Sequence, residues 1–87
     1  MAKYSITFKK SVSKDLRSIP VTDVKRILKK IDSLAENPRA AGCIKLSAQE
    51  CYRVRQGIYR VVYEIRDEDR VVLIIKVAHR STAYKDN

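Results

Sequence analysis

Residues 51–65, CYRVRQGIYRVVYEI, decide the fold of this 87-residue chain. On either side of Gln56-Gly57-Ile58 the sequence is rich in β-branched and aromatic residues and alternates apolar with charged side chains. This pattern is typical of half-buried β-strands, and glycine at the break permits a tight turn. These residues therefore predict two successive strands with one apolar face and one polar face.

The same alternation predicts that three arginines share one face of the sheet. Successive side chains of a strand point to opposite faces, so Arg53 and Arg55 lie together, as do Arg60, Val62 and Glu64 in the next strand. The opposite face is expected to pack against helices, and it comprises Tyr52, Val54, Tyr59, Val61, Tyr63 and Ile65. The arginines should then point outward together.

The length of the turn decides which arginines lie opposite each other. A two-residue loop at Gln56-Gly57 pairs Arg53 with Arg60, and a two-residue loop at Gly57-Ile58 pairs Arg55 with Arg60. Glycine at the first loop position suits a type II′ turn and slightly favours the second register. A three-residue loop would remove both pairings.

Either two-residue register places an arginine directly opposite Arg60, and like charges in that position destabilise a sheet. A fold does not need this arrangement, which suggests a site kept for an external anion. The alternative is that these are ordinary solvated surface arginines, and Glu64 could neutralise part of the cluster.

Two helices are expected before the arginine-rich strands. Val12, Leu16 and Ile19 follow one another at helical spacing up to Pro20. A longer amphipathic helix is capped by Thr22 or Asp23 and stopped by Asn37-Pro38. Its apolar stripe is Val24, Ile27, Leu28, Ile31, Leu34 and Ala35. Its other face carries Lys25, Arg26, Lys29, Lys30, Asp32, Ser33 and Glu36.

The remaining elements complete an α+β fold. Alternation at Tyr4, Ile6 and Phe8 predicts a first strand, residues 44–46 form a short extended piece, and residues 70–78 form a last strand whose apolar run suggests a central position. The predicted order is β-α-α-β-β-β, with two N-terminal helices packed on one face of a mostly antiparallel sheet. Residues 1–87 form one domain, and the other face of the sheet is partly open.

Charge is the strongest compositional signal. Nineteen Lys and Arg residues against ten Asp and Glu residues give a net charge of +9 and an isoelectric point near 9.8. On so small a body this predicts attraction to a polyanion, which could be nucleic acid, ribosome or an acidic protein. No apolar run approaches the roughly 18–20 residues of a membrane span and no signal-peptide core is present, so a cytoplasmic protein without membrane contact is expected.

Metal and disulfide chemistry are not expected. The chain has two cysteines, Cys43 and Cys51, no Cys-x-x-Cys motif and one histidine, His79, a composition that argues against a zinc site. Free thiols in a reducing compartment are preferred over a disulfide.

The C-terminal segment adds a second group of candidate residues. His79 and Arg80 end the last strand, and Tyr84 follows four residues later. If the tail folds back over the sheet, all three could border the arginines, where arginine would bind phosphate and tyrosine would stack on a base. Taken alone, a histidine such as His79 is more often a structural residue at a strand end, and a tyrosine such as Tyr84 is a packing residue as often as not.

Three segments together resemble the RelE/ParE toxin family. Residues 51–65 resemble its basic strand, turn and Tyr-Arg strand, residues 76–85 resemble its closing segment, and residues 37–46 resemble the loop after its second helix. The resemblance runs over nearly the whole chain, and the two C-terminal segments together are fairly specific.

The resemblance implies the toxin half of a type II toxin–antitoxin pair, with a cognate antitoxin as partner. RelE-type members enter the ribosomal A site and cut mRNA without a metal ion or small-molecule cofactor, by attack of a ribose 2′-hydroxyl on the adjacent phosphate. By resemblance Arg60 and Arg80 stabilise the phosphate, and Tyr84 orients and stacks the substrate. Lys76 and Lys85 in the closing segment join Arg53 and Arg55 as candidate RNA contacts.

The chain departs from the family pattern at its basic strand. Arg53 and Arg55 match two positions that are lysines in the best-known member, and arginine cannot easily act as a base because it stays charged. His79 is then the side chain whose ordinary pKa suits proton transfer. The rival explanation is weak catalysis that depends mainly on positioning by the ribosome.

Two other functions remain open. ParE-like members inhibit DNA gyrase and share the fold, so the chain could be a gyrase inhibitor rather than an endoribonuclease. It could also be a non-toxic basic module of the same fold that binds RNA or protein. The expected antitoxin would lay an acidic or amphipathic segment over the basic surface, with residues 24–35 as a possible docking helix whose apolar stripe is otherwise core.

Overall fold

The computed structural model describes residues 3–40, 42–46 and 51–81. A five-stranded sheet with strand order β1-β5-β4-β3-β2 is accompanied by two helices. The elements are β1 (Ser5–Phe8), α1 (Lys10–Arg17), α2 (Val21–Ser33), β2 (Ile44–Lys45), β3 (Cys51–Gln56), β4 (Tyr59–Arg66) and β5 (Val71–His79). The α+β prediction is confirmed, and the short extended piece is a two-residue edge strand.

The sheet is antiparallel except where the first and last strands meet. β1 runs parallel to β5, from Ser5 opposite Val71 to Phe8 opposite Ile74. β5 therefore lies between β1 and β4, as its apolar run predicted, and Val72 and Ile74 are fully buried on its inner side. The β4–β5 ladder shifts register between Val62 and Tyr63, where a β-bulge changes the pairing.

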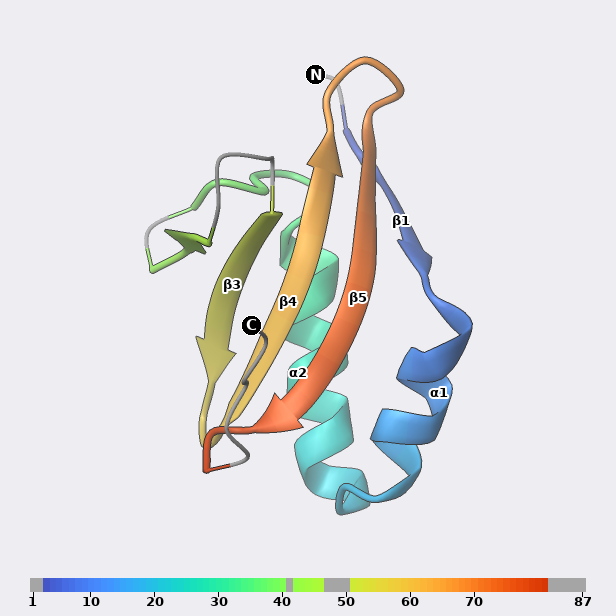
Figure 1. Ribbon diagram of the computed structural model, residues 1–87, viewed down its shortest axis with the longest axis vertical. Coiled ribbons are helices and arrows are strands. Elements are labelled where there is room, and N and C mark those ends of the chain that lie inside the picture. Colours follow the sequence, from blue (N-terminus) through green and yellow to red (C-terminus); the bar gives the residue numbers. More distant parts are fainter. Residues whose placement is uncertain (1–2, 41, 47–50, 82–87) are drawn as a thin grey trace.

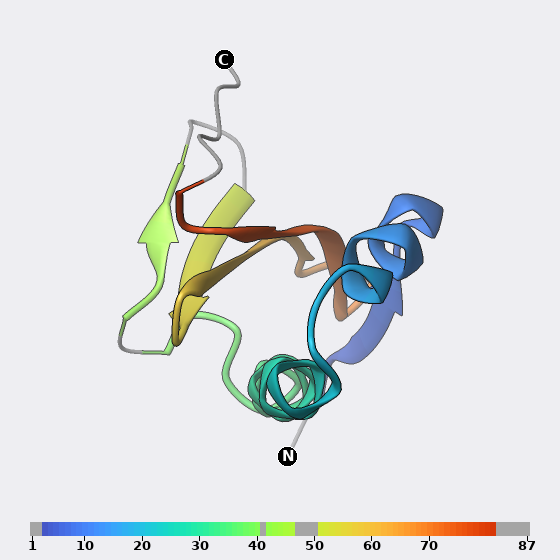
Figure 2. The ribbon, with the colours of Figure 1, turned by 90° about the horizontal axis from the view of Figure 1, so that it is seen from below.

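Both helices lie on one side of the sheet (Figure 1, Figure 2), where α2 contacts β3 and β4 and α1 packs against β5. Val12 of α1 and Ile27 and Ile31 of α2 are buried against Val61 and Tyr63. The apolar side chains of β3 and β4 thus face the helices, as predicted. The opposite face of the sheet, toward the viewer in Figure 1, has no helix over it among the described residues.

The predicted cap of the second helix is wrong. α2 begins at Val21, and Pro20 is its N-cap without a capping side chain. The carbonyl of Pro20 already accepts hydrogen bonds from the N–H groups of Asp23 and Val24 at 2.9 and 3.0 Å. Proline fixes its own φ and has no N–H to satisfy, so helical hydrogen bonding starts before Thr22 and places it in the first turn.

The hairpin has the favoured register. Gln56 pairs with Tyr59 and Arg55 pairs with Arg60, which leaves Gly57-Ile58 as a two-residue loop. Gly57 has a φ of +63°, the left-handed conformation required at the first position of a type II′ turn. The loop therefore fixes which arginines face each other.

Polar contacts join three loops at the opposite end of the sheet. Arg39 Nη2 lies 2.9 Å from Asp67 Oδ2, and the Tyr4 hydroxyl donates to Asp67 Oδ1 at 2.6 Å. These partners, Arg39 first, lower the pKa of Asp67 to about 2. The Tyr63 hydroxyl donates to the Pro38 carbonyl at 2.7 Å, and burial raises the pKa of Tyr63. The loop after α2 is thereby tied to both β1 and the β4–β5 turn.

Two further features concern membrane-spanning helices and the chemistry of the cysteines. In the described part of the chain, neither helix has the length and apolar composition needed to cross a membrane. Cys43 and Cys51 are free and half-buried. Burial, followed by the charge of Glu64, raises the pKa of the Cys51 thiol, which makes it a poor nucleophile.

Candidate functional site

Arg53, Arg55 and Arg60 lie together on the open side of the sheet, and we call this group the arginine face. Arg55 is directly opposite Arg60, while Arg53 is opposite Val62, the residue two positions further along β4. Arg53 is therefore a diagonal neighbour of Arg60 on the same face. Arg53 and Arg60 are half-buried, and Arg55 is exposed.

The arginine face contains unsatisfied hydrogen-bond donors. The Nε atoms of Arg53 and Arg60 are buried and have no hydrogen-bond partner in the part of the chain that the structure describes. Leaving a buried donor unpaired costs about 1–3 kcal/mol, and more for a charged group. Guanidinium groups form strong two-pronged hydrogen bonds with phosphate or carboxylate oxygens, so an external anion would satisfy what the fold leaves open.

Glu64 does not neutralise this cluster through an ion pair. Its Oε1 atom accepts a hydrogen bond from Arg66 Nε at 2.9 Å. Among the ion pairs of the described residues, none involves Arg53, Arg55 or Arg60. Three positive charges thus meet on the open face without an acidic partner among the residues described.

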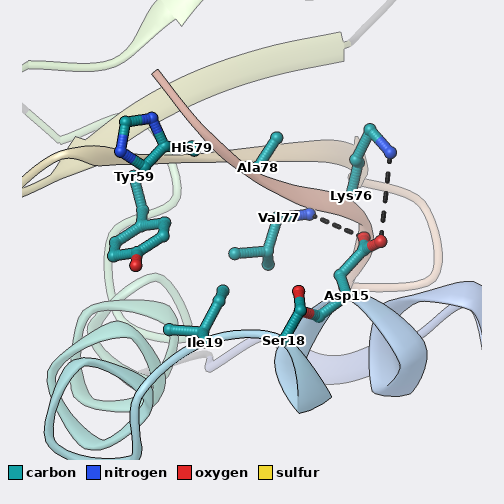
Figure 3. Close-up of a pocket in the computed structure, with 8 residues that line it drawn as sticks. All are labelled: Asp15, Ser18, Ile19, Tyr59, Lys76, Val77, Ala78 and His79. Atoms are coloured by element: carbon teal, nitrogen blue, oxygen red, sulfur yellow. Dashed lines mark hydrogen bonds and ion pairs between the residues drawn. The ribbon is translucent and has the colours of Figure 1, made fainter. Parts of the chain in front are cut away.

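Lys76 borders the arginine face but is partly neutralised. It lies opposite Val62 on β5, and its ammonium is 3.9 Å from a carboxylate oxygen of Asp15. The other oxygen of Asp15 accepts a hydrogen bond from the Val77 N–H at 3.1 Å (Figure 3). Asp15 therefore covers the edge of β5 beyond the end of β1 and restrains Lys76.

His79 lies on the other side of the sheet from the arginines. It is opposite Tyr59, a core residue, and the two rings meet edge to face with centroids 5.6 Å apart. Its Nδ1 atom accepts a hydrogen bond from the Ser81 N–H at 3.0 Å. Figure 3 shows His79 at the rim of a cavity of about 260 Å³ lined also by Asp15, Ser18, Ile19, Tyr59, Lys76, Val77 and Ala78. The structure therefore does not bring His79 together with Arg60.

Arg80 lies at the hairpin end of the sheet. Its N–H donates to the Ile58 carbonyl at 2.7 Å, and the residue is exposed. This contact places its backbone beside the loop that joins Arg55 to Arg60. Tyr84 and Lys85 lie outside the described residues, so their predicted roles stay predictions.

A groove lined by charged and polar residues on the helix side was missed by the sequence analysis. Its volume is about 270 Å³, and Arg26, Lys29, Lys30 and Ser33 of α2 line it together with Gln56 of β3. The cations were predicted to be the outer face of the helix, and that is where they lie. Gln56 could have been added from strand alternation, because it follows Arg55 and so points to the opposite face.

Comparison with known protein families matches this chain to a family of toxins. The family model described as the ParE toxin of type II toxin–antitoxin system, parDE, matches residues 6–84. The chain belongs to the RelE/ParE toxin superfamily. The predicted resemblance is thereby confirmed over nearly the whole length of the chain.

Relatives of this RelE/ParE toxin carry RelE names. It is 33% identical to a protein of Methanocaldococcus jannaschii named as a toxin, RelE1, over 97% of this chain and 98% of that one. It is 30% identical to the mRNA interferase toxin RelE of Escherichia coli, over 88% and 83% of the two chains. The RelE–RelB complex of Pyrococcus horikoshii OT3 matches with a TM-score of 0.79 and 30% identity, covering 95% of this chain and 100% of that one. The chain is therefore a superfamily toxin close to RelE.

Proposed function

We propose that this RelE-type toxin is a ribosome-dependent mRNA endonuclease that stops translation. The observation that carries the proposal is the arginine face, where three guanidinium groups converge and the Nε atoms of Arg53 and Arg60 have no acceptor among residues 3–40, 42–46 and 51–81. The Escherichia coli relative, which bears the name mRNA interferase, supports RNA as the substrate.

The proposed reaction needs charge stabilisation more than a strong base. A ribose 2′-oxygen bonds to the adjacent phosphorus, its proton is removed, and the 5′-oxygen of the next nucleotide leaves and takes up a proton. The pentavalent phosphorane carries extra negative charge, which Arg60 and Arg53 would stabilise by charge-assisted hydrogen bonds. Arg55 and Arg80 would hold neighbouring phosphates, and Tyr84 would stack on a base.

His79 is left out of the proposed machinery. Its ring lies against Tyr59 on the helix side, and its Nδ1 atom is engaged by Ser81. The arginines stay charged at every pH at which the ribosome works, so positioning of the 2′-hydroxyl on the ribosome would contribute a large part of the rate.

The test is cleavage of mRNA on purified ribosomes, with the cut mapped by primer extension. We expect the wild type to cut in the A site, and Arg60→Ala and Arg80→Ala to lower the single-turnover rate at least tenfold. Arg17→Ala, an exposed arginine of α1, is the matched control and should keep the wild-type rate, as should His79→Ala. A wild-type protein that never cuts ribosome-bound mRNA would refute the proposal.

Gyrase inhibition is the second candidate function, because the matching family model is that of the ParE toxin. Inhibition of DNA supercoiling by the purified protein, without mRNA cleavage, would favour it. A non-toxic binding module would instead leave growth unchanged when the chain is expressed without an antitoxin.

A cognate antitoxin is the proposed protein partner. The Pyrococcus horikoshii relative was solved as a RelE–RelB complex. In this chain an apolar groove of about 340 Å³ separates α1 from α2, lined by Phe8, Lys9, Lys10, Val12, Ser13, Leu16 and Leu28. Phe8 and Leu28 are 45% and 40% exposed. An amphipathic antitoxin helix with acidic flanks would fit this groove, and Leu28→Arg should abolish co-purification with the antitoxin while leaving mRNA cleavage intact.

A further inference from the structure

A row of cations on α2 is separate from the arginine face. Lys25, Arg26, Lys29 and Lys30 lie within an arc of about 140° around the helix, given 3.6 residues per turn, and we call them the α2 cationic row. Because α2 lies behind the sheet in Figure 1, this row and the arginine face are on opposite sides of the sheet. The side chain of Arg26 is 72% exposed.

The α2 cationic row is almost without acidic partners. Arg26 lies 4.0 Å from Asp23, and in the described part of the chain Lys25, Lys29 and Lys30 form no ion pair. Lys25 and Lys29 are four positions apart, as are Arg26 and Lys30. Like charges at this spacing destabilise a helix, so the row works against the stability of α2.

Polar residue types lie within and beside the row. Thr22 and Ser33 lie within the same arc, and Gln56 of β3 forms the far wall of the groove that Arg26, Lys29 and Lys30 line. Between the ends of the arc α2 presents no apolar or aromatic side chain. A protein interface normally has an apolar or aromatic centre, and single-stranded RNA is normally held on aromatic stacking platforms.

Double-helical RNA fits these features better than a protein partner or single-stranded RNA does. Double-stranded RNA is recognised mainly by its shape, through phosphates and 2′-hydroxyls. Cations one helical turn apart, such as Lys25 and Lys29, are separated by about 6 Å along the axis of α2 and can follow a phosphate backbone. A 2′-hydroxyl can both donate and accept. Gln56 carries a neutral donor and a neutral acceptor, and the Ser33 hydroxyl, which donates to the Lys30 carbonyl at 2.6 Å, can still accept.

We propose that the α2 cationic row, with Ser33 and Gln56, binds the backbone of double-helical RNA while the arginine face holds the strand to be cut. The inference takes RNA as the partner from the proposed function, in which the ribosome supplies such helices. It assigns α2 to docking and leaves the chemistry to the other side of the sheet.

The test compares two full-length variants that lose the same charge. In the first, Lys25, Arg26, Lys29 and Lys30 are all changed to Gln. In the control, four exposed cations of the α1 region, Lys9, Lys10, Lys14 and Arg17, are changed to Gln. Binding is measured against an RNA duplex of about 16 base pairs, a single-stranded RNA of equal length, and polyglutamate.

We expect the α2 variant to lose at least tenfold more duplex affinity than the control, with a salt dependence of log Kd that is shallower by about 2–4. Equal losses in the two variants would reduce the effect to net charge and overturn the inference. Tighter α2-dependent binding of polyglutamate than of duplex would overturn it in favour of an acidic protein.

Ribosome titrations separate this inference from the proposed function. The α2 variant should need at least tenfold more ribosomes for half-maximal cleavage, yet reach the wild-type single-turnover rate at saturation. If the α2 variant matches the wild type both in the ribosome concentration for half-maximal cleavage and in the single-turnover rate, the docking role of α2 is refuted and the endonuclease proposal is unaffected. If duplex binding depends on α2 but the wild-type protein never cuts mRNA, the endonuclease proposal is refuted and the docking role of α2 is retained.

Discussion

The guanidinium of Arg39 holds the carboxylate of Asp67 with both terminal nitrogens, at Nη1–Oδ1 and Nη2–Oδ2 distances of 3.2 and 2.9 Å. The two residues are 28 positions apart. Arg39 also donates from Nε to the Tyr52 hydroxyl at 3.1 Å. One side chain therefore joins the loop after α2 to the β4–β5 turn and to the inner face of β3.

This pair predicts a stability change in acid. The pKa of Asp67 is lowered from 3.8 to about 2 in the folded protein, so the stabilisation is complete above about pH 4 and is lost as pH falls through about 2. The urea midpoint of Asp67→Asn should lie below that of the wild type at neutral pH, and the difference should vanish near pH 2. Asp69→Asn, an exposed neighbour in the same turn, should show no such pH-dependent difference.

Because Arg55 and Arg60 lie directly opposite each other, removing one charge should raise stability and lower activity. Arg55→Gln removes a like-charge pair, so the free energy of unfolding should rise by about 0.2–1 kcal/mol. Loss of one charge-assisted hydrogen bond to RNA, worth about 1.5–3 kcal/mol, should lower the cleavage rate roughly tenfold to hundredfold. Urea unfolding and single-turnover cleavage measure the two effects, and a variant that loses both stability and activity would show that the pair serves folding.

The turn glycine predicts how the arginine register is kept. Gly57→Ala places a β-carbon at a φ of +63°, which costs about 1–2 kcal/mol in a left-handed conformation. Space is not the cause, because a β-carbon there would meet no atom within 4 Å. Replacing Gly57 by D-alanine in a synthetic chain should cost less stability, since a D-residue favours positive φ. Equal losses in the two variants would contradict this explanation.

Asp15 covers the edge of β5 beyond the end of β1, so its removal should destabilise the fold. Asp15→Ala exposes the Val77 N–H and frees Lys76, and the loss of a charged acceptor should destabilise the fold by about 1.5–3 kcal/mol. An uncovered strand edge also promotes pairing with other chains, so light scattering should rise on storage. Asp15→Asn keeps an acceptor oxygen and should fall between the alanine variant and the wild type.

The α2 cationic row predicts a helix that becomes more stable when its charges are removed. The four-fold Gln variant of α2 deletes two like-charge pairs at i,i+4, each worth about 0.2–0.5 kcal/mol. It also loses the 4.0 Å Arg26–Asp23 ion pair, which is a single surface contact, so its unfolding free energy should equal or exceed that of the wild type. Thermal unfolding followed by circular dichroism measures this. A clearly less stable variant would mean that the lysines contribute to packing through their aliphatic stems.

Local signals in the sequence predicted the parts of the fold that depend on few residues. Gly57 favoured the correct hairpin register, and alternation then placed Arg53, Arg55 and Arg60 on one side. The prediction that Thr22 or Asp23 caps α2 was wrong because helical hydrogen bonding starts at the carbonyl of Pro20. That group belongs to the backbone, so the pattern of capping side chains does not reveal it.

The rest depends on contacts between distant residues. The bulge opposite Val62 and Tyr63 changes the alternation of β5, so the face of His79 could not be derived from sequence without knowing the β4–β5 register. The ion pair that restrains Lys76 joins β5 to Asp15 of α1, and these residues are far apart in the sequence. Tyr84 and Lys85 fall outside the described residues, and their predicted roles are untested.

The parallel pairing of β1 with β5 sets an order for biosynthesis. Ser5 leaves the ribosome early but cannot meet its partner Val71 until most of the 87 residues have been made. β5 also completes the sheet beside β4 and brings Arg80 to the hairpin end. A nascent toxin therefore carries an unpaired first strand until its last strand has been synthesised.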